Sequence, residues 1–218
     1  MEDKFNLTPE QNLFLAKKVL VTNVYNGAKL EGINVTYPET QTILDGVNVT
    51  SLKLDEINTV LNLRDAWKFM LSNIDEEFNL EYLCKINSFV SRNESLEWGV
   101  LRNGKVGISG TDYIPEIPTR EEAEAKLDEI LKEQNITKRA IKLMLKGMRY
   151  QLFWDGNKRT SLIAANKIMI SNGKGIITIK EEFLNEFNKL LTEYYTTNEI
   201  AKIEKFIYDK CIFGLEMN

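Results

Sequence analysis

The chain has 218 residues, with 28 Lys and Arg against 32 Asp and Glu, a formal net charge of −4 and no histidine. This balance is typical of a globular domain and excludes a basic protein that would hold nucleic acid through charge alone. Without histidine, and with only Cys84 and Cys211 as thiols, a zinc site is not expected. We expect a cytoplasmic protein with reduced cysteines and no membrane-spanning helix, because no apolar run reaches 18 residues.

Helices are predicted from the N-terminus onward. Thr8 is a favourable helix cap with Pro9 at the first helical position, and Gly32 is typical of a residue that ends a helix. Tyr37 opens a further segment of helical pattern that stops near Gly46. The first fifty residues are therefore expected to form short helices joined by tight turns.

Longer helices are predicted in the middle of the chain. One begins at Ser51 or Asp55, and the next is capped by Asn79. Thr119 and Glu122 have the spacing of a capping box, which predicts the start of another helix.

Residues 98–118 interrupt the helical pattern. Apolar residues alternate loosely from Val100 to Ile108 around Asn103-Gly104, and this dipeptide is the strongest short signal for a β-hairpin. We therefore expect an all-α fold that carries one short β-hairpin.

The second half of the chain again has helical periodicity. Thr137 is expected to cap a helix, and a very apolar helix is expected from Leu162 to Ile170. Two amphipathic helices follow, and the second begins at Asn198. Basic residues gather between Lys138 and Arg159, which favours a small anionic ligand over a nucleic-acid duplex.

A polar turn joins the two central helices, within residues 151–160. A glycine-containing turn that opens a helix offers free backbone N–H groups to a phosphate. Arg159 can direct two donors at phosphate oxygens, and Asp155 can hold Mg²⁺. From the turn alone, a plain surface connection between two helices is an equally good interpretation. The residues of interest are Asp155, Gly156, Asn157, Lys158 and Arg159.

The same turn resembles the signature of the Fic/Doc (Fido) family, His-x-Phe-x-(Asp/Glu)-Gly-Asn-(Gly/Lys)-Arg. Phe153 matches the structural phenylalanine, whereas Gln151 stands at the position of the catalytic histidine. Two other stretches agree with the family. Residues 99–115 are similar to its flap, and residues 25–39 to the inhibitory helix of one class, which ends here at Glu31-Gly32.

The resemblance implies an all-helical Fic fold and transfer of AMP from ATP to a hydroxyl of a target protein. It implies ATP and Mg²⁺ as cofactors, with Asp155 as the metal ligand and Glu31 as an inhibitory residue. The nucleotide would be bound by Gly156, Asn157, Lys158 and Arg159. An unidentified target protein would dock on the flap through Arg102, Lys105, Val106, Gly107 and Ile108.

By this resemblance, residues 1–218 form a single domain, and a homodimer is one expectation for its assembly. The N-terminal helices occupy residues 1–50, the flap residues 98–118 and the motif helices residues 137–172.

Three departures from the family pattern bear on activity. Gln151 cannot serve as a general base, because an amide has no useful pKa. Leu162 replaces the family's second arginine and Gly27 replaces a Ser or Thr, so Glu31 is expected to lack its salt-bridge partner. We therefore expect weak or absent transfer. The alternatives are a non-catalytic homologue that binds nucleotide or protein, or a kinase toxin like the Doc branch, which residues 158–160 resemble.

Overall fold

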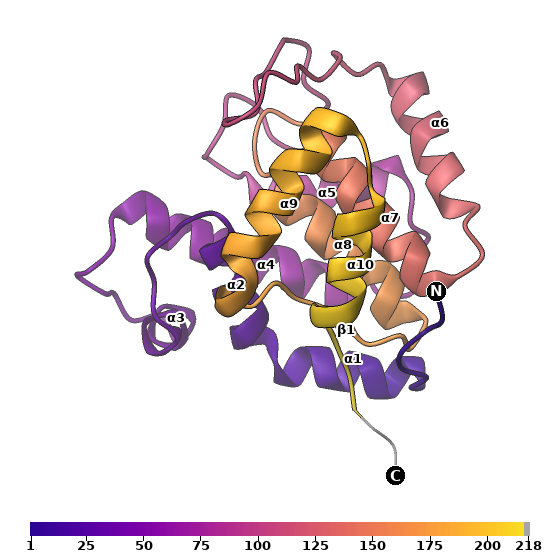
Figure 1. The fold of residues 1–218 in the computed structure, drawn as a ribbon. Coiled ribbons are helices and arrows are strands. Elements are labelled where there is room, and N and C mark those ends of the chain that lie inside the picture. The colour runs from indigo at the N-terminus through magenta and orange to yellow at the C-terminus, as the bar shows by residue number, and fades with distance from the viewer. Residues whose placement is uncertain (216–218) are drawn as a thin grey trace.

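The computed structural model describes residues 1–215 and is almost entirely helical (Figure 1). A 3-10 helix, η1 (Glu181–Phe183), and two short strands, β1 (Ile176–Ile177) and β2 (Ile212–Phe213), accompany the α-helices. The expected all-α class is confirmed. The α-helices are α1 (Pro9–Lys18), α2 (Leu20–Leu30), α3 (Tyr37–Leu44), α4 (Leu54–Ser72), α5 (Leu80–Val90), α6 (Arg120–Leu131), α7 (Ile136–Tyr150), α8 (Asn157–Ser171), α9 (Leu184–Thr197) and α10 (Ala201–Lys210).

Helix α8 forms the centre of the fold, and thirteen of its fifteen residues are buried. A helix that is buried on every side must satisfy its polar side chains internally. Lys167 accordingly donates to the carbonyl of Ile74 at 2.6 Å, and the Asn166 amide exchanges two hydrogen bonds with the backbone of Ile177. Helix α7 packs closely along α8, where a Cβ on Gly147 would lie 2.5 Å from the Ser161 hydroxyl. In Figure 1, α9 and α10 lie in front of this pair, and α1 lies below it.

Local signals set several helix ends as predicted. Thr8 and Thr119 form capping boxes at α1 and α6, and the Asn79 side chain accepts from the third residue of its helix at 2.9 Å. Helix α4 begins at Leu54, between the two predicted starts. Gly32 follows the end of α2 with φ of +80°, as its helix-ending role requires.

Two predicted helix starts were wrong. Asn135, not Thr137, caps α7, because its side chain accepts from the helix backbone at 2.8 Å. Thr137 is buried and donates its hydroxyl to Asp3 at 2.6 Å. Asn198 ends α9 in a left-handed conformation, and α10 begins only at Ala201.

The predicted hairpin at 98–118 was also wrong, because that segment contains no strand. Its path is set by Arg102, whose side chain is 1% exposed. The guanidinium donates to the carbonyls of Gln151 and Gly104, each at 2.5 Å, and of Glu116. The segment therefore folds around one buried cation. The two observed strands pair antiparallel elsewhere, with Ile176 opposite Phe213.

Helix α3 and the start of α4 form a lobe beside the central bundle, at the left of Figure 1, and α2 packs against both. Glu181 ties α2 to η1, because it accepts from Tyr25 and pairs with Lys29 at 2.9 Å. This contact helps to fix the end of α2, and with it Glu31, against the rest of the fold. Within residues 1–215, no helix combines the length and apolar composition that a membrane crossing requires.

Candidate functional site

The turn from α7 to α8 needs two left-handed residues. Gln151 ends α7 with φ of +48°, and Gly156 precedes α8 with φ of +71°. A Cβ on Gly156 would lie 2.6 Å from a methyl group of Val90 and still closer to the Ser91 hydroxyl. Gly156 is therefore required both by its conformation and by the space around it.

Helix α5 holds the turn from outside. The Asn87 amide and the Ser91 hydroxyl both donate to the carbonyl of Asp155, at 3.0 and 2.9 Å. Asn87 also donates to Thr160 at 3.1 Å, so the turn and the first turn of α8 share one partner. Neither Asn87 nor Ser91 was singled out from the sequence, because nothing local marks contacts across 68 and 64 positions.

Asn157 braces the turn from inside. Its amide nitrogen donates to the Phe153 carbonyl at 2.8 Å, and its oxygen accepts from the Phe153 N–H at 2.9 Å. Its side chain is therefore occupied by the protein. Helix α8 itself begins without a side-chain cap, which leaves its first N–H groups without a side-chain partner.

The Gln151 side chain is hydrogen-bonded at both ends. Its nitrogen donates to the Met148 carbonyl at 2.6 Å, and its oxygen accepts from Asn157 at 3.1 Å. Its backbone carbonyl accepts from Arg102. Gln151 thus stabilises the end of α7 and offers no group that could take up a proton near neutral pH.

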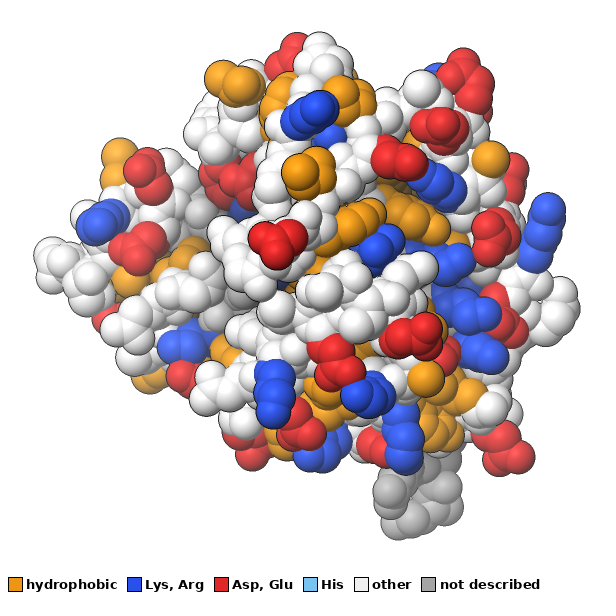
Figure 2. Space-filling view, turned by 45° about the horizontal axis from the view of Figure 1, so that its top comes forward, with side chains coloured by type: hydrophobic (Ala, Val, Ile, Leu, Met, Phe, Trp, Pro, Cys, Tyr) orange, Lys and Arg blue, Asp and Glu red, His pale blue; other side chains and the backbone are white. Residues whose placement is uncertain are grey.

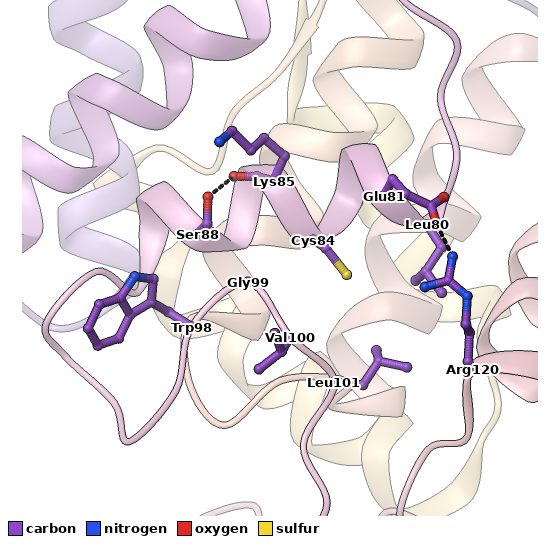
Figure 3. Close-up of a pocket in the computed structure, with 10 residues that line it drawn as sticks. All are labelled: Leu80, Glu81, Cys84, Lys85, Ser88, Trp98, Gly99, Val100, Leu101 and Arg120. Atoms are coloured by element: carbon purple, nitrogen blue, oxygen red, sulfur yellow. Dashed lines mark hydrogen bonds and ion pairs between the residues drawn. The ribbon is translucent and has the colours of Figure 1, made fainter.

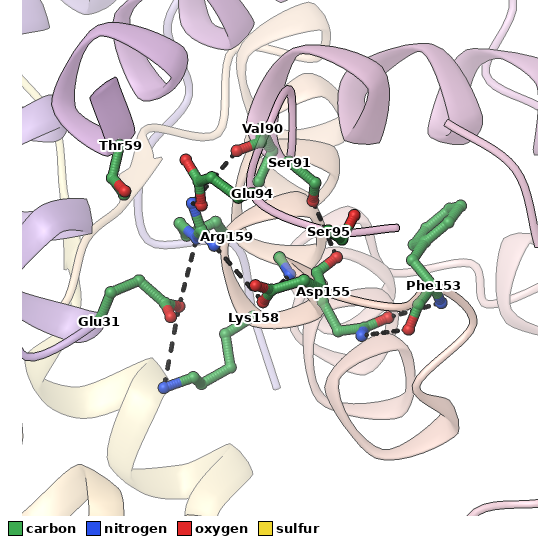
Figure 4. A network of polar contacts seen from close by, with 12 residues as sticks. Glu31, Thr59, Val90, Ser91, Glu94, Ser95, Phe153, Asp155, Lys158 and Arg159 are labelled. Atoms are coloured by element: carbon green, nitrogen blue, oxygen red, sulfur yellow. Dashed lines mark hydrogen bonds and ion pairs between the residues drawn. The ribbon is translucent and has the colours of Figure 1, made fainter. Parts of the chain in front are cut away.

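Arg159 lies at the centre of three carboxylates and is 2% exposed (Figure 4). Its guanidinium is 2.7 Å from Glu94, 3.5 Å from Glu31 and 3.6 Å from Asp155, and it also donates to the Val90 carbonyl. Burial by itself lowers the pKa of Arg159, but the surrounding carboxylates outweigh that effect and raise it. We call this group the carboxylate cage.

Glu31 lacks the partners of the family pattern, because Leu162 and Gly27 stand at their positions, but two other cations lie near it. Its Oε1 lies 3.5 Å from Arg159 and 3.8 Å from Lys158, which also donates to the Leu30 carbonyl. The position of the family's second arginine holds the buried Leu162, and the contact to Glu31 comes instead from the motif arginine, Arg159. These are ion-pair contacts only, because Glu31 Oε1 accepts no hydrogen bond.

Glu94 was missed by sequence reasoning, although it makes the shortest contact in the cage. It follows α5 and also accepts from Asn62 of α4 at 2.8 Å. Glu94 therefore joins α4 to α8, although it lies 65 residues from Arg159 in the sequence. No local pattern around Glu94 signals this role.

A pocket of about 390 Å³ opens beside the cage, between the N-terminal lobe and the turn. One guanidinium, that of Arg159, faces the carboxylates that line it. Within residues 1–215, no group of three or more carboxylates or thiols is placed to hold a metal ion. In this conformation the residues do not fit the phosphates of ATP, because negative charge dominates. The charged lining residues are Glu31, Asp55, Glu56, Glu94, Asp155 and Arg159.

The expected docking residues differ in accessibility. Arg102 is buried and structural, which corrects its assignment to a docking surface. Lys105 and Gly107 are exposed, and Val106 and Ile108 are half-buried. The structure brings none of these side chains into the pocket beside Arg159.

A second hollow, of about 510 Å³, lies between α5 and residues 98–101 (Figure 3). The Cys84 thiol points into it, Trp98 lies at its edge, and an ion pair between Glu81 and Arg120 lies at its other end. No residue of the 151–160 turn lines this hollow.

Both cysteines should react slowly with alkylating reagents. Burial raises the pKa of the Cys84 thiol from 9.0 to about 11 and that of Cys211 to about 12. At pH 8 we expect Cys84 to react with iodoacetamide about 100-fold more slowly than an unperturbed thiol, because the thiolate is the nucleophile. Mass spectrometry of timed samples measures the rate, and urea-unfolded protein is the control. Rapid labelling of folded Cys84 would contradict this picture.

Comparison with known proteins gives one family and several solved structures. Residues 77–169 match the model of the Fic/DOC family. A search of the curated proteins returned no match.

Among solved structures, Fic-1 from C. elegans is 20% identical, with a TM-score of 0.73, over 88% of this chain and 59% of that chain. A Fic domain containing signaling protein from Bacteroides thetaiotaomicron is 17% identical, with a TM-score of 0.71, over 93% and 86%. A Fic family protein from Desulfovibrio desulfuricans is 15% identical, with a TM-score of 0.72, over 92% and 65%. This chain thus spans less than two thirds of the first and third, and identities this low establish the fold alone.

Proposed function

Since residues 77–169 belong to the Fic/DOC family, in a chain with the fold of solved Fic-domain proteins, we propose that the protein is a silenced relative of the protein adenylyltransferases. The related reaction moves AMP from ATP to a hydroxyl of a target protein, and here the transfer is weak or absent. The observation that carries this proposal is Gln151, which occupies the position of the general base with both ends of its amide hydrogen-bonded.

The loss of a base has a large expected effect. A positioned general base contributes roughly 10²–10⁴-fold to the rate, so its absence leaves at most a residual activity. The carboxylate cage supports the same conclusion, because Arg159 is held by Glu94, Glu31 and Asp155. ATP and Mg²⁺ remain proposed ligands, which the cage would have to open to admit.

The cage also favours a second candidate, a non-catalytic homologue that acts by binding a protein. A pocket that carries five carboxylates repels phosphates, whereas the exposed residues of 98–118 are available whether or not nucleotide is present. A kinase of the Doc type ranks last, because that branch also uses the motif histidine that is absent here.

The test compares the native protein with Gln151→His and, as a matched control, Gln151→Ala. Each is incubated with Mg²⁺, a lysate and ATP labelled at the α-phosphate. Histidine is among the residues that tolerate a left-handed conformation, so Gln151→His should preserve the turn. We expect label on protein to rise roughly 10²–10⁴-fold with Gln151→His alone.

Further arms separate the alternatives. Label that appears only in Gln151→His combined with Glu31→Gly would mean that Glu31 also closes the site. Label from the γ-phosphate, with none from the α-phosphate, would favour the kinase. No label in any variant would contradict the adenylyltransferase proposal and leave the binding candidate.

A further inference from the structure

Helix α7 carries a basic face, and one residue on it differs from the others. A spacing of four, four and three residues places four of the five cations of α7 on one side of the helix. Figure 2 shows blue side chains right of the centre, where α7 lies between α10 and α6 in Figure 1. Three of the four have a carboxylate within 4 Å, contributed by Glu133 or Glu129. The four residues are Lys138, Lys142, Lys146 and Arg149.

Arg149 has no carboxylate partner within residues 1–215. Its guanidinium stacks 3.8 Å from the ring centroid of Tyr113 and donates to the Tyr113 hydroxyl at 3.2 Å. The Tyr194 ring lies 6.0 Å away. Its Nε is buried and makes no hydrogen bond. Arg149 is half-buried, and aromatic rings offset only part of the cost of its partial desolvation, so this guanidinium still lacks an anion.

Arg149 lines a pocket of about 310 Å³ between residues 113–118, α6 and the end of α7. Lys126 is the other cation that lines it. The carboxylate paired with Lys126 is that of Glu116, at 3.9 Å, and Glu116 is 85% exposed, so that pair is weak. Glu116 itself also lines the pocket, and the remaining walls are apolar or aromatic, formed by Tyr113, Ile114, Pro118, Tyr150 and Leu152.

We propose that this Arg149 pocket binds an aryl phosphate, that is, a phosphate monoester carried on an aromatic ring. The pocket has two cations and one largely exposed carboxylate, that of Glu116, and the two cations favour the near-double charge of a phosphate monoester over the single charge of a carboxylate. A planar guanidinium is suited to phosphate oxygens, and Ile114, Pro118 and Leu152 give the ring an apolar surface. This inference does not depend on the adenylyltransferase proposal, because the pocket shares no residue with the one beside Arg159.

The test titrates phenyl phosphate into the 218-residue chain by calorimetry, with inorganic phosphate and benzoate as comparison ligands. We expect saturable binding of phenyl phosphate that is tighter than binding of either comparison ligand. Arg149→Met should weaken it about 10–100-fold, because it removes charge-assisted hydrogen bonds and keeps the apolar stem. Lys146→Met is the matched control, since it removes one charge from the same face and should leave affinity unchanged.

Arg149→Lys covers the case in which Arg149→Met does not fold, because it keeps the charge and loses the planar fork. It should still weaken binding. No saturable binding of phenyl phosphate, or equal loss with Lys146→Met, would overturn the proposed site. Equal affinity for benzoate would overturn the assignment to phosphate, and equal affinity for inorganic phosphate would overturn the requirement for an aromatic ring.

Discussion

Arg159→Met should lower the free energy of unfolding by about 3–5 kcal/mol, which is the usual result of removing one partner from a buried ionic group. The guanidinium is 2% exposed and lies within 4 Å of Glu31, Glu94 and Asp155. Methionine fills much of the same space, but it leaves Glu94 and Glu31 half-buried without their shared cation. Urea denaturation followed by circular dichroism measures the change.

Arg120→Met is the control for Arg159→Met. Arg120 also pairs with two carboxylates, Glu81 and Glu124, but its side chain is 58% exposed. Exposed ion pairs contribute about 0–1 kcal/mol, so this variant should unfold close to the native midpoint. If the two variants lost equal stability, the carboxylate cage would not be an important structural contact.

Gly156→Ala should cost about 2–5 kcal/mol, from the sum of backbone strain and crowding. The residue has φ of +71°, and a Cβ would meet the Ser91 hydroxyl and a methyl group of Val90. Both groups belong to α5 or its end, so the substitution should push the turn away from that helix. The measurement is again the change in the free energy of unfolding. Activity and ligand binding should stay unchanged only if the turn keeps its position.

Gly32→Ala isolates the backbone part of this cost. Gly32 has a similar φ of +80°, but a Cβ there would meet nothing within 4 Å. It should therefore lose only about 1–2 kcal/mol, and the difference between the two variants measures the crowding around Gly156. Equal losses would mean that Val90 and Ser91 yield without cost.

The sequence was sufficient where structure depends on neighbours in the chain. The caps at Thr8, Asn79 and Thr119 need only residues within three positions, and all three were predicted. The burial of residues 162–170 in α8 was likewise predicted from the apolar residues of that stretch. These are local signals, and the fold class depends mainly on them.

The candidate site was harder to predict, because its contacts are long-range. Asn103-Gly104 gave a hairpin signal that Arg102 overrides by donating to the carbonyl of Gln151, 49 residues away. Glu94 meets Arg159 across 65 residues, and it follows its helix in a stretch with no recognisable motif. The motif residues could be named from the sequence, but the distant residues that contact their side chains could not.

The way in which Arg102 holds residues 98–118 has a consequence for how this surface can change. The Arg102 guanidinium donates only to backbone carbonyls, those of Gln151, Gly104, Pro115 and Glu116. These hydrogen bonds depend on the path of the backbone and not on which side chains the segment carries. The exposed residues of this segment can therefore be substituted, by evolution or by design, while its backbone keeps its shape. One interior arginine thus holds the backbone of this segment, whichever side chains its exposed positions carry.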